Sequence, residues 1–354
     1  MEREPASEND VYVELLKKMG APNPHSGYLL RILQKMASIE DAWLMLALPA
    51  EPAILVQRTG LGEQEVGQRL KVLAEKGFVI TSKKGPRIPN SITQLHDANL
   101  ASSAKWVDTE LLDLWKEFYE VEWKPAMAKV TWDQYVQYVR TVPAWKAVKK
   151  SPDLPVAELP PEDNLRDLVR GADLIAVVPC TCRRSMRLCH ADLENCVVFN
   201  RGAEYAIERG AGRRITAEEA MAIFERSEEQ GLVHTWPFAA SARLNEICNC
   251  CIDCCGIFDA GIKFNTLPAV LQKSHLKAKV DLDLCDGCQD CVERCYFSAI
   301  EMARAPQGKK LKAAINEEKC FGCGVCAVAC PVDAITMKLA PQPSTPQDAI
   351  KDRR

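Results

Sequence analysis

Seventeen cysteines are the residues of this sequence with the clearest capacity for chemistry. All of them lie between Cys180 and Cys330, and the first half of the chain has none. Their number is odd and many stand at CxxC or CC spacing, which argues against a framework of disulfides. Thiolates at such spacings are ligands for soft metals, so the sequence predicts iron–sulfur or zinc sites.

The last eight cysteines form two runs with the same spacing, C-x2-C-x2-C-x3-C. Three closely spaced thiolates can bind three irons of one [4Fe–4S] cluster, and the fourth cysteine of each run binds the other cluster. We therefore predict two [4Fe–4S] clusters with crossed ligands. The ligands are Cys285, Cys288, Cys291 and Cys330 for the first cluster, and Cys320, Cys323, Cys326 and Cys295 for the second.

Each cysteine of the first run has a counterpart in the second run at the same distance along the sequence. The same distance separates Val280 from Ile315. This predicts an internal duplication, with a strand before and a helix after each cysteine loop. Residues 280–336 resemble the bacterial two-cluster ferredoxin domain, and the resemblance implies electron transfer. Tyr296 departs from that family, which usually has proline at this position. Two zinc sites are the alternative for the same cysteines.

Nine further cysteines lie upstream in two groups. They are Cys180, Cys182, Cys189 and Cys196, followed by Cys248, Cys250, Cys251, Cys254 and Cys255. Nine thiols suffice for one or two further [4Fe–4S] clusters; with a single cluster, the others could bind zinc, be catalytic or stay unused. Adjacent cysteines cannot easily bind one face of a small cluster, which favours dividing neighbours between two sites. A predicted helix at 216–230 separates the groups and could bring them together.

The segment that contains these nine cysteines resembles a region found ahead of ferredoxin domains in 4Fe–4S binding proteins of strict anaerobes. Together with the ferredoxin-like part, this resemblance covers about residues 165–336, and it implies no particular substrate.

Several charged residues flank the upstream cysteines. Five arginines could raise a cluster's potential, or they could be solvated surface residues. They are Arg183, Arg184, Arg187, Arg213 and Arg214. His190 and His234 could bind a cluster or relay a proton, although a lone histidine is more often a structural hydrogen-bonding residue.

The cysteine-free N-terminal half contains a predicted winged helix at 39–90. Three short helices with small residues in the turns precede a predicted strand at Phe78, a pattern typical of helix-turn-helix proteins. The third helix begins Glu63-Gln64-Glu65, which places acid where DNA phosphates would lie. Lys83, Lys84 and Arg87 partly compensate in the predicted wing. We expect this part to dock a protein rather than DNA.

The expected fold class is α+β. We predict a winged-helix-like domain at 1–100, a tryptophan-rich helical segment with a linker at 101–160, a cysteine-rich iron–sulfur domain at 161–275, a two-cluster ferredoxin-like domain at 276–340 and a disordered tail at 341–354.

The composition is that of an ordinary soluble protein, with 47% hydrophobic residues and a net charge of -3. This charge argues against a general attraction to nucleic acid or to anionic membranes. The charged N-terminus has no apolar leader and no apolar stretch reaches membrane length, so we expect a cytoplasmic protein without a membrane span. No nucleotide-binding or nucleophile-elbow motif is visible.

These features predict an iron–sulfur electron-transfer protein or subunit. It would relay electrons between a low-potential donor, such as a ferredoxin or flavoprotein, and a partner oxidoreductase complex. One alternative is a redox-sensing regulator that binds DNA through residues 39–90. Another is a reductase whose substrate binds an open cluster position in the region 180–255.

Overall fold

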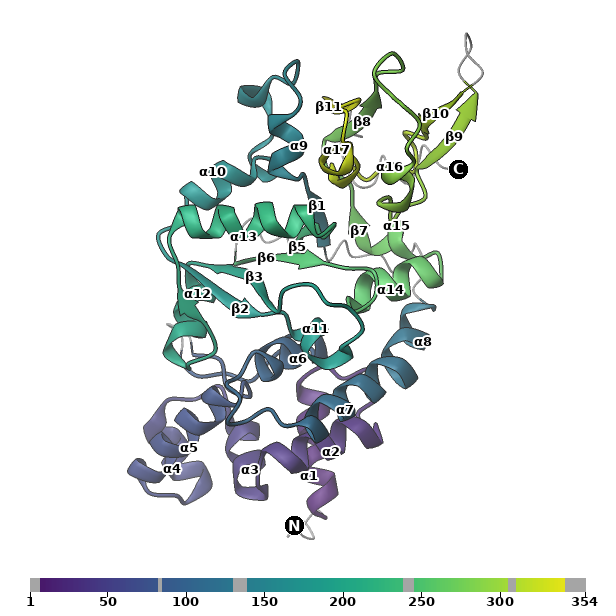
Figure 1. The fold of residues 1–354 in the computed structure, drawn as a ribbon. Coiled ribbons are helices and arrows are strands. Elements are labelled where there is room, and N and C mark those ends of the chain that lie inside the picture. The colour runs from purple at the N-terminus through teal and green to yellow at the C-terminus, as the bar shows by residue number, and fades with distance from the viewer. Residues whose placement is uncertain (1–6, 82–84, 130–138, 238–244, 305–309, 341–354) are drawn as a thin grey trace. The chain divides into compact units, whose positions relative to one another are not determined.

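The computed structural model describes residues 7–81, 85–129, 139–237, 245–304 and 310–340 (Figure 1). The predicted tail at 341–354 lies outside these residues, and so do Lys83 and Lys84 of the predicted wing. The chain contains a run of helices followed by mixed helices and short strands, which confirms the α+β class. The chain divides into two compact units, each made of separate segments. The first comprises 1–129, 176–214 and 254–256, and the second comprises 130–175, 215–253 and 257–354.

The N-terminal part of the first unit is helical. Its helices are α1 (Glu8–Lys18), α2 (Gly27–Met36), α3 (Ile39–Ala47), α4 (Pro52–Thr59), α5 (Glu63–Glu75), α6 (Ile92–Leu100) and α7 (Thr109–Phe118). Serine side chains cap several of them: Ser7 and Ser38 form capping boxes at the starts of α1 and α3. Trp115 is fully buried in the helical core, and its Nε1 donates to Asn99 Oδ1 at 2.8 Å.

The region predicted as a winged helix contains the three expected helices, α3 to α5. Gly60 ends α4 with φ of 72°, a left-handed conformation that suits glycine. The strand predicted at Phe78 is reduced to a single antiparallel bridge between Ile80 and Arg87. The winged-helix assignment therefore stays a prediction.

The rest of the first unit carries six of the upstream cysteines. After α7 come a π-helical turn, η1 (Tyr119–Trp123), and α8 (Lys124–Met127). The later segment contains β2 (Ile175–Pro179), α11 (Thr181–Met186), β3 (Glu194–Phe199), α12 (Arg201–Glu208) and β4 (Arg213–Arg214). The strands pair in the order β4–β2–β3. The first cysteine group thus lies along α11, the loop after it and β3.

The second unit begins with a strand and helices that surround a small sheet. Its elements are β1 (Val139–Val142), α9 (Trp145–Lys149), η3 (Val156–Glu158), η4 (Pro161–Asp163), α10 (Leu165–Arg170), α13 (Ala217–Glu229), β5 (Val233–Pro237), β6 (Glu246–Cys250), α14 (Gly256–Lys263, from its second residue on), α15 (Leu267–Val270) and β7 (Leu271–Gln272). The strand order here is β6–β5–β1–β7, with β5 antiparallel to both neighbours and β1 parallel to β7.

The proline-rich segment that we expected to be a linker is packed into the second unit. Leu154 and Leu159 are buried, and Ser151 Oγ accepts a hydrogen bond from the Met337 backbone N–H at 2.7 Å. Local composition indicated a linker, but these long-range contacts fix the segment against the C-terminal part of the chain.

The C-terminal part repeats one pattern twice. Its elements are β8 (Leu276–Val280), α16 (Asp290–Glu293), β9 (Ile300–Arg304), β10 (Leu311–Ile315), α17 (Val325–Ala329) and β11 (Ile335–Leu339). A strand precedes each cysteine loop, as predicted. The helix begins inside the cysteine run and a strand follows the run, so the prediction of a helix after each loop was partly wrong. The strands pair across the repeats: β8 is antiparallel to β11, and β10 to β9.

Among the described residues, no helix combines the length and the apolar character needed to cross a bilayer.

Glycine is required where the chain turns after α5. Gly77 has φ of 82°, and a Cβ there would lie 2.3 Å from the Ala98 carbonyl carbon. We predict that Gly77→Ala lowers the free energy of unfolding by about 2 kcal/mol or more. Gly67 is the control, because it lies inside α5 with open space around it, and Gly67→Ala should stabilise by up to about 1 kcal/mol. Equal denaturation midpoints for the two variants would contradict this.

Candidate iron–sulfur sites

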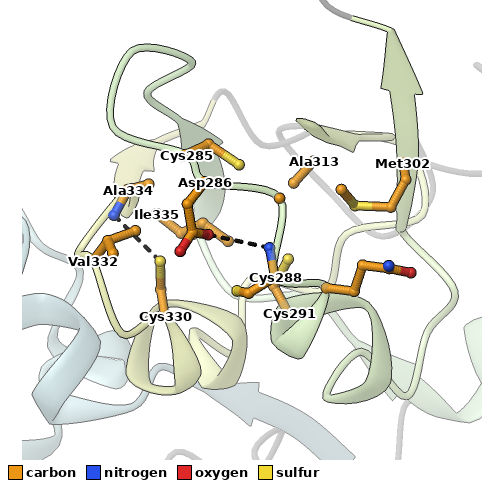
Figure 2. A pocket seen from close by; sticks show the side chains of 12 residues that line it. Cys285, Asp286, Cys288, Cys291, Met302, Ala313, Cys330, Val332, Ala334 and Ile335 are labelled. Carbon is orange, nitrogen blue, oxygen red and sulfur yellow. Dashed lines mark hydrogen bonds between the residues drawn. The ribbon is translucent and has the colours of Figure 1, made fainter. Parts of the chain in front are cut away.

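Four cysteines surround a first pocket in the C-terminal part (Figure 2). The pocket is lined by Cys285, Cys288, Cys291 and Cys330. Backbone groups fix two of these residues: the Ala334 N–H donates to Cys330 Sγ at 3.2 Å, and the Cys288 N–H donates to an Asp286 carboxylate oxygen at 3.1 Å.

A second pocket is lined by Cys295, Cys320, Cys323 and Cys326. The Ala299 N–H donates to Cys295 Sγ at 3.3 Å, which repeats the contact at Cys330. Each pocket thus combines three cysteines from one run with the fourth from the other run. These are the two sets that the sequence assigned to two clusters, and their role as ligands stays a prediction.

The crossed sets result from the strand pairing. In the register, Val280 of β8 pairs with Ile335 of β11, and Ile315 of β10 pairs with Ile300 of β9. The strand that leads into one cysteine loop is therefore hydrogen-bonded to the strand that leaves the other run. This arrangement delivers the last cysteine of each run to the pocket of the other.

The chemistry of the two pockets fits a cationic metal cluster. Burial, followed by the neighbouring Cys288 and Cys285, raises the pKa of Cys291 to about 11. Burial likewise raises the pKa of Cys323 and Cys326 well above the usual value, and further cysteines add to the shift. Such thiols do not ionise together at neutral pH unless a metal replaces their protons. The donor set therefore suits [4Fe–4S] clusters.

The two pockets differ in the exposure of one cysteine. Cys288 in the first pocket is exposed, whereas the other seven cysteines that line the pockets are buried or half-buried. The loop of the second pocket packs against α9, where the Ala144 N–H donates to the Cys323 carbonyl at 2.9 Å. A Cβ at Gly324 would lie 2.6 Å from the Ala147 Cβ, so only glycine permits this approach.

Residues 284–334 match the family model of the 4Fe-4S dicluster domain. This part of the chain is a ferredoxin-like iron–sulfur domain. No curated protein and no solved structure matches the chain. The match begins after the upstream cysteines, so their role must be argued from the structure.

In the first unit, six upstream cysteines lie as three pairs. The contacts join Cys180 to Cys196, Cys182 to Cys255, and Cys189 to Cys254 with a sulfur–sulfur distance of 3.8 Å. The adjacent Cys254 and Cys255 therefore contact different partners.

In the second unit, Cys248 and Cys250 lie on β6, and Cys251 follows it. The Thr235 hydroxyl is 3.3 Å from Cys250 Sγ. Burial and then Cys251 raise the pKa of Asp253 above its usual value.

The five arginines have different environments. Arg183 is buried, and its Nε donates to Cys189 Sγ at 3.3 Å. Arg184 donates instead to backbone carbonyls in the first unit, and Arg187 pairs with Asp113. Arg213 and Arg214 are exposed on β4. The structure thus places the guanidinium of Arg183, in particular, at a cysteine sulfur.

The two candidate histidines also differ. His190 is exposed in the loop after Cys189. His234 is fully buried: its Nδ1 is 2.5 Å from Asn249 Oδ1, and its Nε2 is 3.0 Å from Glu228 Oε1. Both ring nitrogens therefore face oxygen acceptors, which supports a structural role for His234.

Glu228 is a buried residue that the sequence analysis missed. Its two carboxylate oxygens accept hydrogen bonds from the backbone N–H groups of Trp145 and Lys146, at 2.7 and 2.9 Å. These contacts join α13 to the start of α9, which in turn packs on the loop of Cys323. The sequence pattern does not distinguish Glu228, because it lies next to Glu229 at an ordinary acidic helix end.

We predict that Glu228→Gln lowers the free energy of unfolding by about 2–4 kcal/mol, because the amide cannot accept from all three donors in a fully buried site. Glu229 is the matched control, since it forms an exposed ion pair with Lys146 and Glu229→Gln should cost less than about 1 kcal/mol. Chemical denaturation of both variants measures the difference, and equal losses would rule out a special role for Glu228.

Proposed function

We propose that this protein is an electron-transfer protein or subunit that relays electrons between a low-potential donor and a partner oxidoreductase complex. The observation that carries the proposal is the pair of four-cysteine pockets in a ferredoxin-like domain. When bound there, [4Fe–4S] clusters supply one-electron chemistry. The chain's own residues hold the cysteines in place and donate backbone N–H groups to sulfur.

The exposure of Cys288 supports a direction for the relay. The first pocket, with the exposed Cys288, is the side at which an external protein can approach. The second pocket faces the rest of the second unit. Phe297 and Phe321 line it and stack at 4.4 Å, and Phe258 of α14 lies 6.0 Å from Phe297. We propose that electrons pass between the second pocket and the upstream cysteines of the second unit, Cys248, Cys250 and Cys251.

Tyr296 supports the same route. Burial raises its pKa to about 12, and Cys251, Asp253 and Cys323 add to the shift. The phenol is therefore within electrostatic reach of both an upstream cysteine and a cysteine of the second pocket. We propose that the aromatic side chain, in place of the proline that the resemblance leads one to expect, fills the space between these two cysteine regions.

The N-terminal helices are proposed as a docking surface for the partner protein. On α5, Arg69 is held by Asp41 and Glu65 at 2.8 and 3.0 Å, so its charge is already neutralised. Trp43 of α3 and Ile54 of α4 are 51% and 41% exposed. Exposed apolar side chains and neutralised cations favour a protein partner over DNA. Steeply salt-dependent binding to duplex DNA would instead support the alternative function, a redox-sensing regulator that binds DNA through residues 39–90.

The setting of the protein is part of the same proposal. Exposed thiolate ligands such as Cys288 favour a reducing compartment, and we propose the cytoplasm of an anaerobe.

The crossed ligand sets provide the test of the proposed function. In anaerobically purified protein, Cys288→Ala should remove about four irons and one low-potential EPR signal. The double variant Cys288→Ala/Cys330→Ala should lose no more iron than the single variant, because both residues serve one cluster. Combining Cys288→Ala with Cys295→Ala should remove about eight irons. Each loss should also slow reoxidation of the dithionite-reduced protein by a one-electron acceptor.

Two results would contradict this proposal. One is an iron content and EPR spectrum that do not change in Cys288→Ala. The other is zinc in place of iron in the parent protein, which would make the domain structural. Ser298→Ala serves as a surface control, since Ser298 is exposed and lies outside both pockets.

A further inference from the structure

Four of the upstream cysteines come together in the first unit. Cys180 is in hydrogen-bond contact with Cys196, and Cys182 with Cys255. The two pairs are joined because Cys180 and Cys182 stand two residues apart at the start of α11, within electrostatic reach of each other. Cys180, Cys196 and Cys255 are buried. This is a compact group of four soft ligands, drawn from three separate segments of the chain.

The backbone beside these four cysteines packs closely against their sulfurs and the neighbouring rings. The Gly256 N–H donates to the Cys182 sulfur. A Cβ at Gly256 would lie 2.3 Å from the Tyr119 ring, so glycine alone lets residue 255 reach this position. The start of α11 is fixed to α6, because the Thr181 hydroxyl donates to Asp97 Oδ1 at 2.8 Å.

Aromatic side chains form a wall beside Cys182 and Cys255. The Tyr119 ring packs on His96 at 4.7 Å and on Trp123 at 5.6 Å. Tyr119 is buried, and burial followed by Cys182 raises its pKa well above the usual value. The phenol is therefore neutral, and the wall excludes water from the thiols.

Two buried nitrogens in this wall have no hydrogen-bond partner within the described residues. They are Trp123 Nε1 and His96 Nε2, and the His96 side chain is 1% exposed. The indole N–H is a donor only. It lies 3.6 Å from the Cβ position of Gly256, next to Cys255. Buried donors are normally satisfied, so an acceptor belongs at this place. Cluster sulfide and thiolate sulfur are acceptors of the right kind.

We propose that Cys180, Cys182, Cys196 and Cys255 bind a third [4Fe–4S] cluster, with Trp123 as a hydrogen-bond donor to it. The ring of Tyr119 shields the site from solvent. Cys189 and Cys254 form a separate contact and lie outside this ligand set. The inference goes beyond the ferredoxin-like domain and does not need its two clusters.

The first test uses the anaerobically purified full chain and measures iron, acid-labile sulfide and zinc. Cys182→Ala and Cys196→Ala should each remove about four irons and four sulfides, and the double variant should remove no more. Adding Cys288→Ala to Cys182→Ala should raise the loss to about eight irons. Three results would overturn the ligand set. They are a double variant that loses as much iron as the two single variants together, an unchanged iron content, and loss of zinc in place of iron.

The EPR signals of the ferredoxin-like domain separate the two proposals. If those signals persist while Cys182→Ala leaves the iron content unchanged, the third site is wrong and the electron-transfer proposal stands. If those signals are missing from the parent protein while the four irons at Cys182 are present, the proposed function fails and the third site stands.

A milder variant covers the case in which the cysteine variants do not fold. Trp123→Phe keeps the ring and removes the N–H, so the iron content should not change. Loss of a hydrogen bond to sulfur should shift one cluster potential to a more negative value in EPR-monitored titration. Trp106→Phe is the control, because the Trp106 ring faces Lys76 and Lys105. Potentials that stay unchanged in Trp123→Phe, or a shift confined to the ferredoxin-like signals, would contradict the role of Trp123.

Discussion

Thiols in a dry environment cannot lose their protons unless a cation takes their place, and the ferredoxin-like domain depends on this constraint. Burial and crowding raise the pKa of Cys291, Cys323 and Cys326, so the pockets are unfavourable for isolated thiolates. A domain of this size buries little apolar surface, and metal binding then supplies folding free energy directly. Because each pocket takes its fourth cysteine from the other repeat, both pockets must form in one folding event.

The sequence predicted what depends on local spacing. The cysteine runs and the helices α3 to α5 follow patterns that neighbouring residues set by themselves. The prediction of a strand at Phe78 was wrong because a strand needs a neighbouring strand to pair with. Within the described residues, only Ile80 of this segment forms a β-bridge. The prediction of a linker after Ser151 was wrong. The prolines there indicate a loop, but they do not predict the long-range hydrogen bond between Ser151 and Met337.

Glu228 shows the limit of sequence reasoning most clearly. Its importance comes from three donors that lie on different elements, His234 on β5 and two backbone N–H groups at the start of α9. No periodicity or motif relates those elements. The same applies to the third set of cysteines, since Cys255 is far from Cys182 in the sequence and only the fold brings them together.

The contacts of α9 bear on how electrons would move through the second unit. Buried hydrogen bonds link Asn249, beside Cys248 and Cys250, through His234 and Glu228 to α9, whose preceding residue Ala144 binds the loop of Cys323. Such groups are held by fixed partners and cannot turn when charge arrives, unlike water. These contacts hold the backbone of the Cys323 loop against α9. Gly324 has no room for a side chain against Ala147, so the loop of Cys323 packs directly on α9.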